Sequence, residues 1–208
     1  TKRTMNLEDI DHEDGSDNTA GIGQDIWVAK LADIATLPTP QLDDSAGTGN
    51  FSQLVTISDN IVMKSGKVFN KIRVTLETSA LNGDIQGNMD GKSFKNAISG
   101  QIPGNKAKAL GFLQWAKNSS LIAIIEELDG QVRILGHRAY PATLPAGSAN
   151  TGAKTTDDRA VKFTLESVRK GPAPVFTGKV VLTGGAVGSG SFDANNNTYQ
   201  DIEFVSGS

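Results

Sequence analysis

The sequence predicts a mainly β protein, a β-sandwich or partial barrel, with one flanking α-helix near 105–117 and extended terminal arms. Two segments alternate strictly between apolar and polar residues, which is typical of strands with one buried face. One segment instead carries apolar residues at helical spacing. Both ends of the chain are rich in Gly, Asp, Asn and Ser, a composition that buries too little apolar surface to fold alone.

The clearest predicted strands are residues 69–78 (FNKIRVTLET) and 160–168 (AVKFTLESV). In each, apolar side chains at every second position point to one face, since successive strand residues face opposite sides. The predicted buried positions are Ile72, Val74, Leu76, Val161, Phe163 and Leu165.

A hairpin is predicted from residues 121–128 and 131–135, because Asp129-Gly130 between them is a strong turn signal. Residues 178–183 (GKVVLT) form a further short strand. Residues 79–100 contain glycines at hairpin spacing and predict either two short strands or a long loop.

Residues 25–37 (DIWVAKLADIATL) are apolar and end at Pro38. Short apolar runs of this kind fit a helix or a strand, so both remain open at this point. The single predicted helix covers 105–117, with Asn105 as its N-terminal cap. Its predicted apolar face consists of Ala109, Leu110, Leu113 and Ala116, widened by Phe112 and Trp115.

We therefore divide the chain into three parts: a flexible acidic N-terminal arm (1–23), one β-rich core domain (24–183) and a Gly/Asn-rich C-terminal loop and strand (184–208). A chain of 208 residues is long enough for a single β domain of this kind.

The composition excludes several classes of protein. The net charge of −3 argues against a general nucleic-acid binder, which needs a basic patch. The absence of cysteine excludes disulfides, thiolate metal sites and cysteine nucleophiles. No apolar run approaches the roughly 18–20 residues of a membrane span, and we expect a chain made in a cytoplasm without membrane partners.

Sequence motifs do not indicate catalysis. The two histidines, His12 and His137, are isolated, and no G-x-S-x-G elbow accompanies them. Gly91-Lys92-Ser93 lacks the glycine that a phosphate loop places five residues earlier. The run 184–190 (GGAVGSG) does not have dinucleotide-binding spacing. We expect no enzyme activity and no cofactor.

A weak calcium candidate lies in the C-terminal segment, where oxygen-bearing side chains alternate as in a calcium loop: Asp193, Asn195, Asn197 and Asp201. Thr198 stands where such a loop needs glycine, and Phe204 stands at the position of the bidentate carboxylate. A strand with one polar face is the alternative.

Candidate assembly contacts are large amphipathic rings, which are favoured at interfaces, and flexible glycines. The predicted residues are Trp27, Trp115, Phe112, Tyr140, Gly184 and Gly190.

The stretch from Ile124 to Val180 carries a hairpin ending in LG, a Pro-Ala-x-Leu step, a polar loop, an F-x-x-E-S strand and a Pro-rich turn before F-x-G. This pattern resembles structural proteins of tailed bacteriophages and related prophages, particularly those of the Bacteroidetes lineage. The overall layout is similar to that of tail tube (major tail) proteins.

The resemblance implies a virion structural protein, located in the tail and assembled in the bacterial host cytoplasm. Its subunits would form hexameric rings that stack into a tube around a DNA channel. The implied partners are other copies of itself, other virion proteins and double-stranded DNA that passes without specific binding. The alternatives are another virion component, such as a head decoration, capsid-associated or fibre protein, or a carbohydrate or cell-surface binding module.

Overall fold

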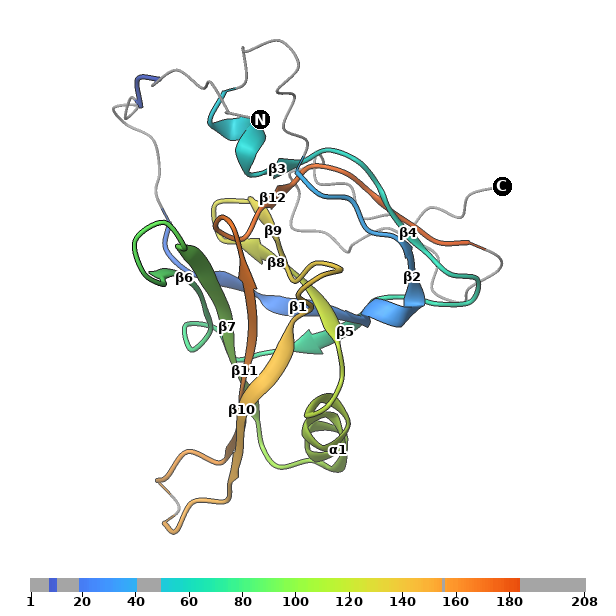
Figure 1. Cartoon of the computed structure of the whole chain (residues 1–208). Helices are drawn as coiled ribbons and strands as arrows, with labels where there is room; N and C mark the ends of the chain where they lie inside the picture. Colours follow the sequence, from blue (N-terminus) through green and yellow to red (C-terminus); the bar gives the residue numbers. More distant parts are fainter. Residues whose placement is uncertain (1–7, 11–18, 41–49, 155, 184–208) are drawn as a thin grey trace.

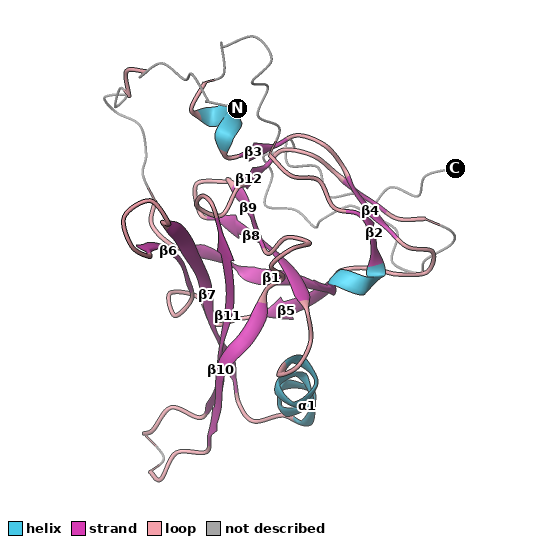
Figure 2. Cartoon of the chain, viewed as in Figure 1, coloured by secondary structure: helices cyan, strands magenta, loops and turns pink. Residues whose placement is uncertain are grey.

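The computed structural model describes residues 8–10, 19–40, 50–154 and 156–183. Within these residues the protein is mainly β, with three sheets and a single α-helix (Figure 1, Figure 2). The predicted fold class is therefore confirmed. One six-stranded sheet lies between the other two and supplies a face to the hydrophobic core on each side.

This central sheet has the strand order β3-β12-β9-β8-β1-β5. Its strands are β3 (Thr56–Ile57), β12 (Val175–Phe176), β9 (Val132–Leu135), β8 (Leu121–Glu127), β1 (Ile22–Lys30) and β5 (Asn70–Arg73). All neighbours are antiparallel except β12 and β3, which are parallel. The predicted hairpin is β8–β9, and Gly130 takes the positive φ of 88° that its turn requires.

Strand β8 explains why its sequence is apolar at consecutive positions. Ile122 and Ile124 belong to one hydrophobic cluster, whereas Ala123 and Ile125 belong to the other. Since successive side chains point to opposite faces, β8 is buried on both sides. A continuous apolar run is the expected pattern for such a strand.

The second sheet, which we call the outer sheet, has the order β10-β11-β7-β6 and is antiparallel throughout. Its strands are β10 (Thr143–Asn150), β11 (Ala160–Arg169), β7 (Ser93–Pro103) and β6 (Ala80–Gln86). The predicted strand 160–168 is β11, with Val161, Phe163 and Leu165 buried. Of the alternatives for 79–100, two strands are correct, although β7, at 11 residues, is far longer than expected.

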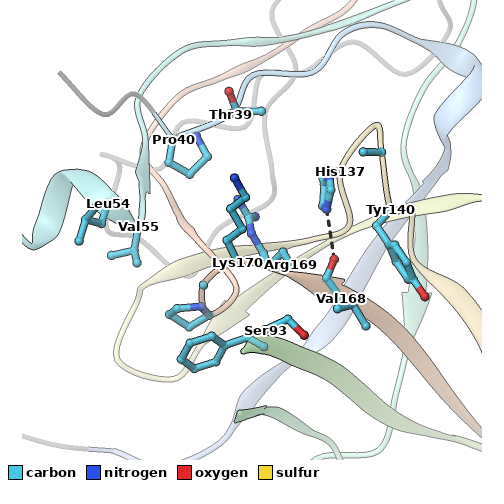
Figure 3. Close-up of a pocket in the computed structure, with 14 residues that line it drawn as sticks. Thr39, Pro40, Leu54, Val55, Ser93, His137, Tyr140, Val168, Arg169 and Lys170 are labelled. Atoms are coloured by element: carbon cyan, nitrogen blue, oxygen red, sulfur yellow. Dashed lines mark hydrogen bonds between the residues drawn. The ribbon is translucent and has the colours of Figure 1, made fainter. Parts of the chain in front are cut away.

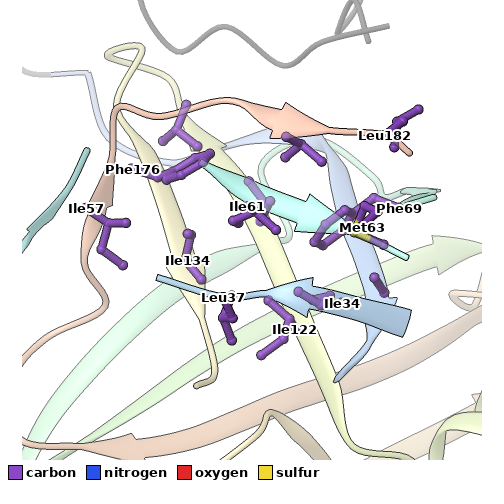
Figure 4. Packing of buried hydrophobic residues seen from close by; sticks show 14 residues of the cluster. Ile34, Leu37, Ile57, Ile61, Met63, Phe69, Ile122, Ile134, Phe176 and Leu182 are labelled. Atoms are coloured by element: carbon purple, nitrogen blue, oxygen red, sulfur yellow. The ribbon is translucent and has the colours of Figure 1, made fainter. Parts of the chain in front are cut away.

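The third sheet, the small sheet, has the order β13-β4-β2, with strands β13 (Val180–Val181), β4 (Ile61–Met63) and β2 (Ile34–Thr36). It covers the other face of the central sheet and closes a cluster that includes Ile61, Met63 and Phe176 (Figure 4). Residues 55–66 and 174–183 run side by side as a parallel ribbon that passes from the central sheet into the small sheet.

The ribbon depends on a close backbone approach at Gly178. A Cβ atom at this position would lie 2.4 Å from the carbonyl oxygen of Asp59, closer than any real contact allows. The two chains are joined there by hydrogen bonds from Lys179 N to Asn60 Oδ1 (2.9 Å) and from Ile61 N to Lys179 O (2.9 Å). Glycine is therefore needed at 178 for lack of space.

The predicted helix is α1 (Ala107–Ala116), which packs beside the outer sheet. Two details of the prediction are wrong. The Asn105 side chain donates to the carbonyl of Asn150 (2.9 Å) and does not cap the helix, which has Lys106 at its N-cap without a side-chain bond. Leu110 is 40% exposed. The helix is rotated so that its inward face contains Ala109, Phe112, Leu113 and Ala116.

The predicted strand 69–78 is too long. Strand β5 ends at Arg73 because the chain then crosses from the central sheet to the outer sheet. Val74 N donates to Gln24 O of β1 (2.7 Å), whereas Thr75 N donates to Gln101 O of β7 (2.8 Å). Leu76 in this crossing is 43% exposed, against the prediction that it is buried.

The ambiguous stretch 25–37 contains no α-helix. It is occupied by most of β1, the 3-10 turn η1 (Leu31–Asp33) and β2. Strand β1 begins at Ile22, within residues 1–23 of the predicted N-terminal arm. A second 3-10 turn, η2 (Ser52–Leu54), precedes β3.

Candidate functional site

The outer sheet has one face on the core and one face away from it. Ile98, Phe163 and Leu165 are buried in the cluster shared with the central sheet. The residues next to them along each strand therefore point away from the core, and so do the residues paired with those neighbours on adjacent strands. These outer-face residues include Asn82, Asp84, Gln86, Lys95, Ser99, Gln101, Ser148, Lys162, Thr164 and Glu166, together with the apolar Ala80, Ala97, Ala146 and Val168.

Charges on the outer face are largely arranged in opposite-sign pairs. Lys95 Nζ lies 3.0 Å from Glu166 Oε2, and Lys162 Nζ lies 3.9 Å from Asp158 Oδ2. Each exposed pair contributes at most about 1 kcal/mol to stability. Their larger consequence is electrostatic, because paired charges present no strong field of one sign to a polyanion.

The outer strands β6 and β10 each pair on one side only among the described residues. An unpaired strand edge offers free N–H and C=O groups to another chain. On β6, Ile85 is 62% exposed, and Met89 in the following turn is 87% exposed. On β10, Pro145 and a register shift disturb the start of the strand, whereas Ala146–Asn150 pair regularly with β11.

The β10–β11 hairpin extends away from the rest of the chain (Figure 1). Its tip is organised by Asp157, whose Oδ2 accepts from the backbone N–H groups of Lys154 and Ala153, both at 2.8 Å. These two bonds lower the pKa of Asp157, because they favour the charged carboxylate. One strand of the hairpin is exposed, since every residue of β10 except Leu144 is exposed.

The predicted aromatic contacts are distributed over the molecule. Trp27, on β1, is partly buried against the small-sheet cluster, with Lys71 Nζ 5.4 Å from its ring centre. Trp115, on α1, is 45% exposed, and Lys30 Nζ lies 4.7 Å from its ring centre. Phe112 packs edge-on against Phe163 inside the core, with ring centres 5.5 Å apart.

Tyr140 is 51% exposed and lies in a tight turn with His137. The two residues exchange backbone hydrogen bonds of 3.2 and 3.1 Å, and His137 Nε2 lies 3.1 Å from Val168 O. His137 is thus a structural residue that ties this turn to β11. The turn borders a cavity of about 680 Å³ (Figure 3).

This cavity lies where β7 begins and β11 ends, beside η2 and Pro40. Two of its lining residues, Gly171 and Pro172, belong to a segment held by the buried Asn96, whose amide donates to Gly171 O (3.2 Å) and whose oxygen accepts from Ala173 N (3.0 Å). Arg169 and Lys170 also line it. Burial lowers the pKa of Arg169, because desolvation disfavours the charged guanidinium.

The remaining sequence predictions divide into two groups. The calcium candidates Asp193, Asn195, Asn197 and Asp201, together with Gly184, Gly190 and His12, lie outside the described residues. Gly91-Lys92 lies in the turn between β6 and β7, and Ser93 begins β7. Among the described residues, no three His, Cys, Asp or Glu side chains are grouped to hold a metal ion, and no helix is long and apolar enough to cross a membrane.

The sequence did not single out Ile85, Met89, Arg169 or Lys170. A signal for Ile85 was present, since it is a large apolar residue in a segment rich in Gly, Asn and Asp. Arg169 and Lys170 follow the 160–168 strand directly, but their position at a cavity depends on segments distant in sequence.

Comparison with known proteins gives no further indication: no family, no curated protein and no solved structure matches this chain.

Proposed function

We propose that this chain is a self-assembling virion structural protein, the subunit of a phage tail tube made of stacked rings around a DNA channel. The observation that carries the proposal is the outer sheet: it has four strands, a polar face directed away from the core and open edges on β6 and β10. Edge pairing between copies would join such sheets into one closed barrel, which removes the edges.

The outer face would then line the channel. Of its charged residues, Lys95, Glu166 and Lys162 lie in the pairs Lys95–Glu166 and Lys162–Asp158, and the remaining one is the carboxylate Asp84. A lining of this kind gives phosphates no run of cations to bind, since affinity for DNA grows with the number of phosphates neutralised. Lys71 and Arg73, two further cations on an alternating strand, lie on β5 of the central sheet and not on the outer face, where they contact Asp25 and Gln24.

A carbohydrate-binding module is supported less well. Such a module uses aromatic rings exposed on a flat sheet face. Trp115 is exposed but lies on α1, and Trp27 lies on a sheet but is partly buried. The two rings therefore do not form a platform of this kind.

The test is imaging and sedimentation of the purified full chain. We expect rings or tubes of uniform diameter in negative stain, with a sedimentation coefficient that rises with concentration. A strict monomer at every concentration would contradict the proposal. Trimers, or binding to capsids alone, would favour a head component instead.

The edge variant Ile85→Lys sharpens this test. A charge on the β6 edge should weaken association about tenfold or more, since inward edge charges block strand addition. The matched control is Leu110→Lys, which places the same change at a 40% exposed position on α1. Equal loss of assembly in both variants, with unchanged circular dichroism, would show that the β6 edge is not the contact.

A further inference from the structure

The two edge strands of the outer sheet differ in the charge around them. Residues 76–91, which contain β6, have no Lys or Arg and three exposed acids: Glu77, Asp84 and Asp90. Strand β10 has no charged residue, and helix α1 packs against it, since a Cβ at Gly147 would lie 2.9 Å from Leu113 Cδ2. Residues 104–120, which contain α1, have no acid and three exposed lysines: Lys106, Lys108 and Lys117.

The tip of the β10–β11 hairpin does not reverse the sign at the β10 edge. In residues 151–162 three cations outnumber two acids. Of the acids, Asp157 accepts from two backbone N–H groups, and Asp158 lies 3.9 Å from Lys162 Nζ. One edge of the sheet is therefore acidic and the other basic. Such edges attract each other, whereas two β6 edges or two β10 edges repel.

The directions of the edge strands also match. Because the outer sheet has four strands and is antiparallel throughout, β6 and β10 run in opposite directions. A rotation about an axis along the strands preserves these directions, so β6 of one copy meets β10 of the next as an antiparallel pair. The available part of β10 is 146–149, since Pro145 has no N–H and Asn150 O accepts from Asn105 Nδ2 (2.9 Å).

The register of the outer sheet indicates which residues meet. Ala146 on β10 lies level with Ala80 on β6 across the pairs Ala146–Thr164, Thr164–Ser99 and Ser99–Ala80. In a closed eight-stranded barrel with a tilt of about 36°, the register shifts by about one residue per strand. Four strands shift it by about four residues, which brings Ala146 of the next copy opposite Asp84. An unshifted ring would place most of β10 beyond the start of β6.

We propose that β6 of one copy pairs antiparallel with residues 146–149 of β10 of the next copy, with Asp84 opposite Ala146 and Asn82 opposite Ser148. These four residues all belong to the outer face, so the polar face continues across the junction. The inference rests on the proposed function and adds to it which edges meet, in which direction and in which register.

Disulfide formation between copies tests the register, because the chain contains no cysteine. Asn82→Cys and Ser148→Cys are placed in two full-length chains that carry different tags. After mixing and mild oxidation we expect a covalent heterodimer, since directly opposed Cβ atoms lie about 4.5–5.5 Å apart and a disulfide needs about 3.5–4.5 Å. A single chain with both changes should give a ladder of covalent multimers, because every copy then has two reactive edges.

The matched control is Ala149→Cys, which is next to Ser148 on β10 and points to the opposite face. Mixed with Asn82→Cys, it should give at least about tenfold less heterodimer. An equal yield would overturn the register. Homodimers of Asn82→Cys alone, or of Ser148→Cys alone, at the yield of the heterodimer would overturn the pairing of unlike edges.

The cross-links also separate this inference from the proposed function. Rings or tubes without the Asn82–Ser148 link would overturn the pairing and leave the tail tube intact. A covalent ladder without rings or tubes would support the pairing and contradict the tube. A chain that stays monomeric and unlinked contradicts both.

The charges of the two edges are tested by sedimentation at two salt concentrations. Lys108→Glu should weaken association about threefold in 0.1 M salt, and the effect should disappear in 1 M salt, where the Debye length falls from about 10 Å to about 3 Å. The control Lys64→Glu makes the same change at an exposed turn after β4, away from the outer sheet. Equal weakening by both variants would contradict attraction between the unlike edges.

Discussion

The small sheet and the outer sheet cover opposite faces of the central sheet, but they differ in how much of themselves they bury. The small sheet has strands of two or three residues, and its residues Ile61, Met63 and Val180 are almost fully buried. The outer sheet has strands of 7 to 11 residues, and β10 and most of β6 are exposed. The outer sheet therefore extends beyond the core that it covers.

The difference separates two roles. The small sheet completes the core of the chain, since its cluster is closed by side chains from both ends of the described residues. The outer sheet has one face on the core, whereas its other face, two edges and a long hairpin are free among the described residues and would make the contacts of the proposed assembly. We expect substitutions of buried residues in either sheet to lower stability, and substitutions on the exposed edges of the outer sheet to weaken the proposed association.

The largest effect is expected at Gly178, in the ribbon that leads into the small sheet. Gly178→Ala puts a Cβ against the Asp59 carbonyl, so the ribbon must separate, at a cost of about 3 kcal/mol or more in free energy of unfolding. Chemical denaturation measures this cost. Gly171→Ala is the matched control, because a Cβ there has no neighbour within 4 Å; similar losses in both variants would show that the close approach is unimportant.

A smaller loss is expected at Asn96, which joins the outer sheet to the segment before β12. Asn96→Ala leaves Ala173 N and Gly171 O without their partners. Each buried group left unpaired costs roughly 1–3 kcal/mol, so we expect about 2–3 kcal/mol in thermal or chemical unfolding. The control Asn82→Ala, on exposed β6, should change stability by less than about 0.5 kcal/mol. An Asn96 variant as stable as this control would exclude the bridging role.

The smallest effect on stability, with a distinct pH dependence, is expected at Asp157. Its pKa is lower in the folded chain than in the unfolded chain. Its contribution is therefore present above the ordinary Asp pKa of about 3.9 and is lost as pH falls through the lower folded value. Asp157→Ala should speed amide exchange at Ala153 and Lys154 above the folded pKa, with at most a small decrease in global stability.

The neighbouring Asp158→Ala is the control for this effect, because Asp158 contacts Lys162 and Gln101 and accepts no backbone bond in the tip. If both variants speed exchange at Ala153 and Lys154 equally, the cause is loss of charge and not loss of the two backbone hydrogen bonds.

Local pattern was sufficient where a segment has one environment along its length. Alternation predicted β11 because this strand has one face on the core and the other face directed outward along its length. Asp129-Gly130 predicted the β8–β9 hairpin, because the turn needs a positive φ at glycine. The candidate site was predicted less well: Tyr140 borders the cavity, but Arg169, Lys170 and the exposed Ile85 depend on contacts between distant segments.

The sequence by itself determined a mainly β chain with one helix, since periodicity and turn chemistry are properties of neighbouring residues. Only the tertiary structure decided that β8 lies between two clusters and that residues after Arg73 cross between sheets. The rotation of α1 about its axis, which turns Phe112 and not Leu110 toward the core, is also decided by tertiary packing. The reason is the same in each case. Which residues of a strand or helix are buried depends on the sheet that packs against it, and the sequence pattern of a single segment does not contain that information.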